Sequence, residues 1–95
     1  MRVISLRTLR EFWEIYPDAE TPLRTWYRIA LMEEWQNPSE VRGMFPHADS
    51  VGDLTVFNIG GNKYRLIVRI RYDFQLINIR AVLTHKEYDK GDWKA

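Results

Sequence analysis

The sequence predicts an α+β domain, in which an N-terminal helical hairpin packs on one face of a small, mostly antiparallel sheet. Two patterns support this prediction: apolar residues recur at helical spacing in the first half of the chain and at alternate positions in most of the second half. A chain of 95 residues has material for one hydrophobic core, so we expect a single domain over residues 1–95. A hydrophobic content of 45% against 28% charged residues is typical of a globular protein.

Residues 1–6 are expected to form a short first strand, and two helices should follow it. Thr8 and Glu11 have the spacing of a capping box, which predicts the start of the first helix. An aromatic face follows, and Pro17 should end the helix. The second helix is expected to be capped by Thr21, to have proline in its first turn and to continue toward Trp35. Because the link between the two helices is short, they should form an antiparallel hairpin.

A brief third helical turn, a polar loop and three strands should follow the hairpin. The turn begins at Asn37, which precedes a proline and an acid, and the polar loop covers residues 47–53. Strands are expected at residues 54–59, 63–72 and 76–83, because the side chains there follow a period of two. Two glycines between the first two of these strands predict a tight turn. The predicted order is β-α-α-β-β-β, with the short helical turn before the second strand.

The charges are unevenly distributed, although the formal net charge is only +1. Residues 1–53 contain six basic and nine acidic residues, whereas residues 54–95 contain eight basic and four acidic ones. Such asymmetry favours a surface with a positive side, which attracts polyanions at long range. A chance enrichment of acidic residues in the helices and basic residues in the strands would give the same counts. The counts therefore do not decide between a functional positive surface and chance.

The strand expected at residues 63–72 carries much of this positive charge on one face. Successive side chains of a strand point to opposite faces, and the odd positions here are mostly basic. These basic residues are Lys63, Arg65, Arg69 and Arg71. Arg80 on the next strand should extend the face, and nothing between the strands is expected to neutralise it. We expect an open cationic face for an RNA or DNA backbone, while a merely solvated sheet face or a site for an acidic protein segment remain alternatives.

Residues 84–90 (THKEYDK) place proton carriers and cations directly after the last strand. Histidine exchanges protons near neutral pH, nearby cations lower the pKa of a tyrosine, and lysine stabilises a charged phosphorus centre. Cleavage of RNA without a metal needs a base for the 2′-hydroxyl, a cation for the equatorial oxygens and an acid for the leaving oxygen, and this segment offers all three. A capped helical turn with solvated charges explains the same residues, so the segment alone does not decide between these interpretations.

Composition also limits the chemistry that the chain can perform. It has no cysteine, which excludes disulfides, thiol catalysis and zinc bound by cysteine. His85 and Asp89 have the spacing of two metal ligands on a helix, but no third ligand is spaced beside them, so we expect neither a metal nor another cofactor. No apolar run approaches the ~18 residues of a membrane span, so a soluble, cytoplasmic protein is expected.

Residues 56–66 (VFNIGGNKYRL) together with residues 84–90 resemble the HigB family of type II toxin–antitoxin toxins. The resemblance extends over nearly the whole chain, and it implies a RelE-like fold and an mRNA interferase. Such an enzyme cuts messenger RNA without a metal, commonly on the translating ribosome. The resemblance further implies a HigA-type helix-turn-helix antitoxin as partner, and contact with operator DNA only indirectly through that antitoxin.

The two motifs supply the site residues that the resemblance implies. The catalytic residues would be Lys63, Arg65, His85, Lys86 and Tyr88, and the RNA-binding residues Asn62, Arg69, Arg71 and Arg80. We expect Arg65 and Lys63 to clamp the scissile phosphate. His85 and Tyr88 would share the duties of base and acid, with Lys86 helping to lower a pKa.

This site requires the imidazole of His85 to approach Arg65. Unbroken alternation places the core side chains of the last strand at Ile77, Ile79, Ala81 and Leu83. His85 would then share the core side, so the strand must end or bulge near Thr84.

Two other functions remain open at this stage. A catalytically silent module of the same fold would bind an antitoxin and take part in operon repression, since a fold does not guarantee chemistry. The ParE branch of the superfamily, which poisons gyrase, lacks the nuclease residues, and the cluster from His85 to Tyr88 argues against it.

Overall fold

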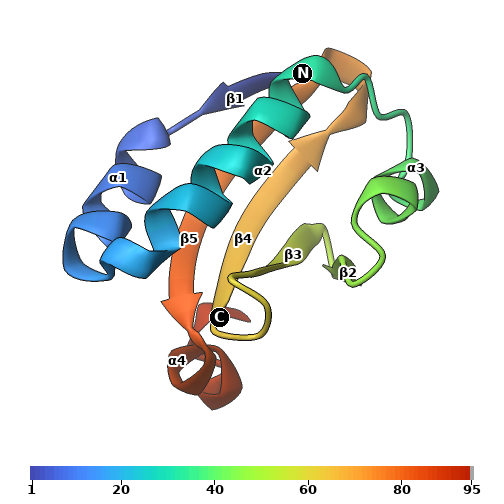
Figure 1. Cartoon of the computed structure of the whole chain (residues 1–95). Helices are drawn as coiled ribbons and strands as arrows, with labels where there is room; N and C mark the ends of the chain where they lie inside the picture. The colour runs from blue at the N-terminus through green and yellow to red at the C-terminus, as the bar shows by residue number, and fades with distance from the viewer. Residues whose placement is uncertain (95) are drawn as a thin grey trace.

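The computed structural model describes residues 1–94 and confirms the α+β architecture (Figure 1). One five-stranded sheet has the strand order β1-β5-β4-β3-β2. Its strands are β1 (Arg2–Ile4), β2 (Asp49–Val51), β3 (Leu54–Ile59), β4 (Tyr64–Arg71) and β5 (Leu76–Thr84). β1 runs parallel to β5, and the other neighbouring pairs are antiparallel, as the prediction of a mostly antiparallel sheet requires.

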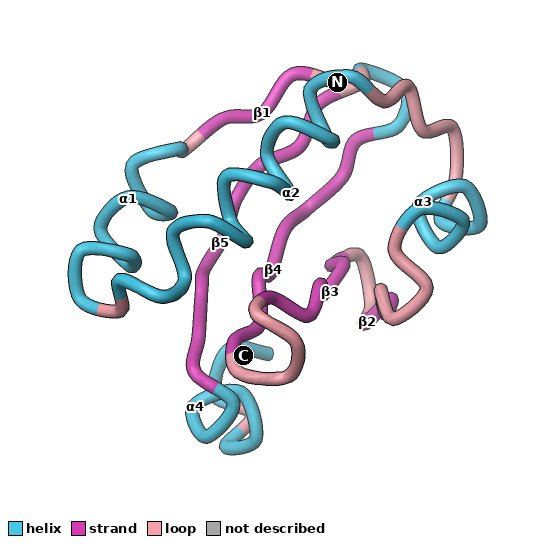
Figure 2. The backbone as a smooth tube through the Cα atoms, viewed as in Figure 1, coloured by secondary structure: helices cyan, strands magenta, loops and turns pink. Residues whose placement is uncertain are grey.

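Four helices accompany the sheet, namely α1 (Leu6–Ile15), α2 (Glu20–Met32), α3 (Pro38–Met44) and α4 (His85–Lys90). Short 3₁₀ turns follow α1, β4 and α4, at Pro17–Ala19 (η1), Tyr72–Phe74 (η2) and Asp92–Lys94 (η3). α1 and α2 form the predicted antiparallel hairpin across one face of the sheet, whereas α4 lies beyond the end of β5 (Figures 1 and 2). None of the helices within residues 1–94 has the length and apolar character to cross a membrane.

The helix ends differ from the predicted ones because backbone geometry replaces two of the expected side-chain caps. α1 begins after Ser5, which adopts a left-handed conformation, so Thr8 lies inside the helix and caps nothing. α2 already begins at Glu20, and it ends at Met32 before reaching Trp35. The cap of α3 is the predicted one, since the Asn37 side chain accepts a hydrogen bond from the Glu40 N–H.

The main core fills the space between the α1–α2 hairpin and the sheet. Trp26 on α2 and Trp35 after it are each 1% exposed, and both pack against the ring of Phe57 on β3. Leu66 and Val68 of β4 are completely buried on the same side. Burial of a side chain of this size contributes about 1.5–3 kcal/mol, so these contacts fix how the hairpin sits on the sheet.

Strand β2 was not expected, because residues 49–51 lie in the segment predicted to be a polar loop. The strand is short and mostly exposed, so its side chains show no apolar alternation. It forms the sheet edge beside β3, with Asp49 opposite Val56.

A bulge in β5 changes which of its side chains face the core. Ile67 of β4 pairs with Ala81 but Val68 pairs with Ile79, which leaves Arg80 as an extra residue. Beyond the bulge the alternation is reversed, so that Val82 joins the core. The predictions for Ala81 and Leu83 are therefore wrong: these residues lie opposite Ile67 and Arg65, on the face away from the helical hairpin.

Candidate active site

The two sequence motifs meet at one end of the sheet, where β5 passes directly into α4 (Figure 1). Thr84 ends the strand and caps the helix: its hydroxyl accepts from the Glu87 N–H at 3.2 Å, and the Glu87 carboxylate accepts from the Thr84 N–H at 2.9 Å. The backbone N–H of His85 donates to the Lys63 carbonyl at 3.0 Å. The start of α4 is thereby attached to the loop between β3 and β4. The predicted end of the strand at Thr84 is confirmed, and the bulge lies earlier, at Arg80.

Arg65 is held rigidly at this end of β4. Its Nη1 donates to the carbonyls of Asn62 and Tyr64, each at 3.2 Å, and its Nη2 donates to Asn62 Oδ1 at 2.7 Å. The guanidinium carbon lies 5.3 Å from the centroid of the Tyr88 ring, a cation–π contact. Only 8% of Arg65 is exposed. The expectation of an open row of side chains is therefore wrong for Arg65, because Tyr88 and the hairpin loop surround it.

Tyr88 links Arg65 to the C-terminal segment of the chain. Besides its contact with Arg65, the phenol ring stacks on the Trp93 ring, with a centroid separation of 4.9 Å and an interplanar angle of 15°. The Trp93 indole N–H donates to the Tyr88 carbonyl at 2.9 Å. The position of Trp93 beside Tyr88 was not predicted from the sequence. The only signal was an aromatic residue shortly after the second motif, and no helical or strand period connects the two rings.

His85 forms a pair with Asp89 on α4. The imidazole Nδ1 and a carboxylate oxygen are 2.9 Å apart, and both side chains are about half exposed. Residues three and four positions apart share a helix face, so His85, Tyr88 and Asp89 lie together. The bond to Asp89 occupies Nδ1 and leaves Nε2 for proton exchange with a substrate. Within residues 1–94, no three histidine or acidic side chains are grouped so that they could hold a metal ion.

Lys63 lies at this loop but points toward the helical hairpin. Its ammonium pairs with Asp18 of η1 at 2.5 Å, and Asp18 also accepts a hydrogen bond from the Tyr64 hydroxyl at 2.6 Å. The bonds to Lys63 and Tyr64 lower the pKa of Asp18 below 3.8, and the bond to Asp18 raises the pKa of Tyr64 to about 12. Lys63 thus connects the loop between β3 and β4 to the turn between α1 and α2.

An Asp18→Asn variant is expected to show weaker dependence of stability on pH at both ends of the scale. The lowered pKa of Asp18 means that its stabilising contribution is present above 3.8 and is lost as the pH falls through the folded value. The raised pKa of Tyr64 means that its contribution is present below 10 and is lost as the pH rises through about 12. Urea unfolding in acid and tyrosinate absorbance in alkali measure the two effects. Identical profiles for variant and wild type would contradict the anchoring role of Asp18.

The remaining cations do not form the unneutralised row that the sequence predicts. Arg69 pairs with Asp53 at 3.3 Å, and Arg71 pairs with Asp73 at 3.5 Å, because the loops beside β4 supply acids that strand alternation does not reveal. Arg80 is exposed at the bulge, and no acid in the described part of the chain lies within 4.0 Å of it. Lys86 is exposed on α4, and Asn62 is exposed while its amide oxygen orients Arg65.

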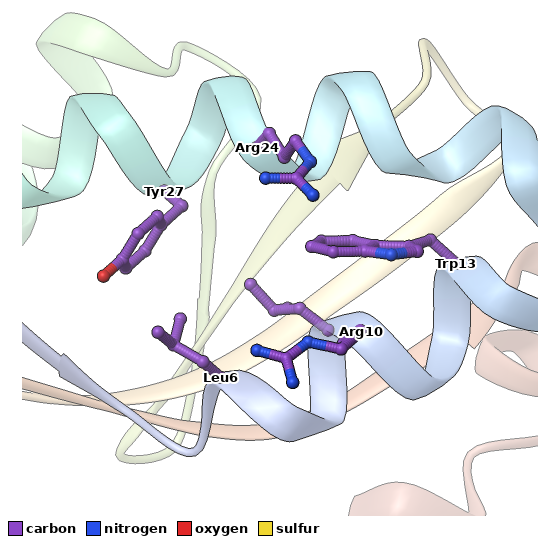
Figure 3. Close-up of a pocket in the computed structure, with 6 residues that line it drawn as sticks. Leu6, Arg10, Trp13, Arg24 and Tyr27 are labelled. Carbon is purple, nitrogen blue, oxygen red and sulfur yellow. The ribbon is translucent and has the colours of Figure 1, made fainter.

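The surface formed by residues 1–94 includes three hollows that bear on the position of the site. A cavity of about 130 Å³ lies between α1 and α2, where Arg24 covers the Trp13 ring at 4.7 Å (Figure 3). No residue of either motif lines this cavity. A groove of about 240 Å³ includes Asn58, the cross-strand partner of Arg65, and another of about 350 Å³ includes Trp93. The last two hollows therefore border the residues around Arg65 and Tyr88.

Comparisons with known proteins agree with the resemblance inferred from the motifs. The family model for HigB_toxin, a RelE-like toxic component of a toxin–antitoxin system, matches residues 19–91, which include every predicted site residue. The mRNA interferase toxin HigB of Escherichia coli (strain K12) is 33% identical over 92 residues, covering 94% of this chain and 88% of that protein. The mRNA interferase HigB of Shigella flexneri gives the same values, and that of Escherichia coli O6:H1 is 29% identical over 93 residues, covering 95% and 90%. The chain therefore belongs to the HigB family of RelE-like toxins of toxin–antitoxin systems.

Proposed function

We propose that this chain is an endoribonuclease toxin that cleaves mRNA and thereby inhibits translation. Its relatives carry the name mRNA interferase, and its two motifs meet at one site. The contact between Arg65 and Tyr88 carries the proposal, because it joins a fixed cation from the first motif to a proton carrier from the second. His85 lies on the same helix face as Tyr88.

The reaction proceeds by attack of the 2′-hydroxyl on the adjacent phosphorus. His85 and Tyr88 share two proton transfers: one removes the proton of the 2′-hydroxyl, and the other protonates the 5′-oxygen as its bond to phosphorus breaks. The products are a 2′,3′-cyclic phosphate and a 5′-hydroxyl. Arg65 stabilises the charge on the equatorial oxygens with N–H donors that its bonds to Asn62 and Tyr64 leave unused.

The exposed cations support this centre. Lys86 adds positive potential beside His85, which favours binding of the phosphate group at the site. Lys63 contacts the phosphate by exchanging its ion pair with Asp18 for one with a phosphate oxygen, while Asp18 keeps its hydrogen bond from the Tyr64 hydroxyl. Arg69, Arg71 and Arg80, with Asn62 at the loop, guide the RNA backbone.

The partners follow from the same proposal. A toxin of this family requires an antitoxin, which we propose to be of the helix-turn-helix HigA type and to provide the link to operator DNA. Ribosome-bound mRNA in the cytoplasm is the proposed substrate.

Incubation of the purified chain with mRNA on stalled ribosomes tests the proposal directly. Primer extension is expected to show new 5′ ends within the message, in the presence of a chelator, and the fragments should end in a cyclic phosphate. A parallel reaction with the same mRNA without ribosomes measures whether the ribosome is required. Intact message in both reactions would contradict the proposed activity and favour a silent, antitoxin-binding module.

Higher salt is expected to weaken RNA binding steeply, because each neutralised phosphate releases counterions. For a single strand the logarithm of the binding constant falls by about 0.7 per phosphate for each unit of log salt. Arg80→Ala should reduce this slope by about 0.7, whereas Arg28→Ala, an exposed position on α2, should leave it unchanged. Fluorescence anisotropy of a labelled RNA over a potassium chloride series measures both slopes. A flat response of the wild type would favour a shape-driven protein partner for this face.

A further inference from the structure

We propose that Trp93 is a positioning residue of the nuclease site, which holds the phenol of Tyr88 in its working orientation against Arg65. This inference rests on the proposed function, because it assigns Trp93 a role only through the proton transfer of Tyr88. It concerns a residue outside both sequence motifs and outside the segment that matches the HigB family model.

Trp93 contacts Tyr88 at two points that together restrict its movement. The near-parallel stack at 4.9 Å fixes the plane of the phenol ring, and the indole N–H fixes the backbone carbonyl of the same residue at 2.9 Å. Stacked aromatic pairs stabilise each other beyond the burial of their area. The two contacts therefore act on both the ring and the backbone from which it projects.

The chain reverses direction after α4, and this reversal brings Trp93 against Tyr88. Gly91 follows the helix with a φ of 78°, a left-handed conformation that costs glycine nothing, and its N–H donates to the Tyr88 carbonyl at 3.1 Å. The chain then folds into η3, where the Lys94 N–H donates to the Gly91 carbonyl at 3.1 Å. The last turn of the chain is thus shaped to return the indole to α4.

Little else orients the phenol. None of the residues of α4 is fully buried, and the Tyr88 hydroxyl has no hydrogen-bond partner among residues 1–94. Its ring has two aromatic or cationic contacts, Arg65 at 5.3 Å and Trp93 at 4.9 Å. A hydroxyl without a partner among residues 1–94 is suited to donate to a substrate, and the two ring contacts restrict where it points.

Direct stacking of an RNA base on Trp93 is the alternative role, since the indole also borders the hollow of about 350 Å³. The two roles affect the kinetics differently. A positioning residue affects the chemical step, whereas a base platform contributes to substrate binding.

The test measures single-turnover and steady-state cleavage of ribosome-bound mRNA by five variants and the wild type. Trp93→Ala is expected to lower kcat by about 10- to 100-fold, the cost of a small misplacement of a catalytic group, with KM changed less than about twofold. Trp93→Phe keeps a stacking ring and should recover most of kcat. In a Tyr88→Phe background, Trp93→Ala should have no further effect, because the hydroxyl that it positions is absent. Arg28→Ala, at an exposed position of α2 outside the site, should behave as wild type.

Thermal unfolding shows which variants are folded, and Trp93→Leu replaces Trp93→Ala if the latter is not. An inactive Tyr88→Phe together with a fully active Trp93→Ala would overturn the positioning role and leave the proposed function intact. A raised KM at unchanged kcat, or additive losses in the double variant, would overturn it in favour of direct RNA contact. Undiminished cleavage by Tyr88→Phe would remove Tyr88 from the proposed mechanism and overturn the inference with it, while absence of cleavage by the wild type would contradict the proposed function itself.

Discussion

An Arg65→Ala variant is expected to lose the ability to arrest growth when it is produced without an antitoxin. Arg65 is the one cation of the first motif that is held by hydrogen bonds and by Tyr88, so it is pre-arranged to stabilise charge on the phosphate. Loss of one such group costs about 10²–10³ in kcat. Colony formation after induction and cleavage of ribosome-bound mRNA measure the loss.

Two controls separate chemistry from folding at this position. Arg65 is nearly buried, so its removal also leaves Asn62 without a donor, and thermal unfolding should be followed for each variant. Arg65→Lys preserves the charge but lacks the planar group that binds both oxygens of Asn62, and should recover only part of the activity. Arg28→Ala removes an exposed cation of α2, outside both motifs, and should remain toxic. A folded Arg65→Ala variant that still arrests growth would show that the guanidinium is not part of the chemistry.

A His85→Gln variant is expected to cleave mRNA about 10²–10⁴ times more slowly, the contribution of a general acid or base. Glutamine has a similar size and can hydrogen-bond to Asp89, but it cannot carry a proton between two partners. Because the imidazole is about half exposed, the replacement should change the melting temperature little. Rate measurements under single-turnover conditions, with a melting curve for each variant, provide the comparison.

Asp89→Asn is the matched variant for the histidine. It keeps a hydrogen-bonding partner at Nδ1 but removes the charge that orients the ring, so a smaller loss than that of His85→Gln is expected. If His85→Gln retained full activity in a folded protein, proton transfer would have to be assigned to other groups.

Local patterns in the sequence were sufficient to predict the main elements. Each of them is encoded by neighbouring residues: the aromatic face before Pro17, the alternation from Tyr64 to Ile70 and the two glycines of the hairpin. A capped helical turn after β5 was one of the two interpretations of residues 84–90, and the structure shows that Thr84 and Glu87 form its capping box. The motifs then brought Arg65 and Tyr88 into one hypothesis.

Features that depend on distant residues could not be predicted in this way. The extra residue at Arg80 is visible only when the register of β4 against β5 is known, and it reverses the facing of Ala81 and Leu83. The partner of Lys63 is Asp18, which lies 45 positions earlier in the chain. Arg65 resembles the other basic residues of its strand, and only the placement of α4 makes it a buried group.

Helix α4 has no fully buried residue, so we expect it to open more readily than the rest of the domain. Unwinding this six-residue helix would uncover little apolar surface, so its free energy of opening lies far below that of the sheet. In the opened form the imidazole and the phenol are withdrawn, while the guanidinium stays in the folded sheet. Such an opening would separate these groups from the guanidinium, and a ligand that binds one form in preference to the other would set the fraction of competent molecules.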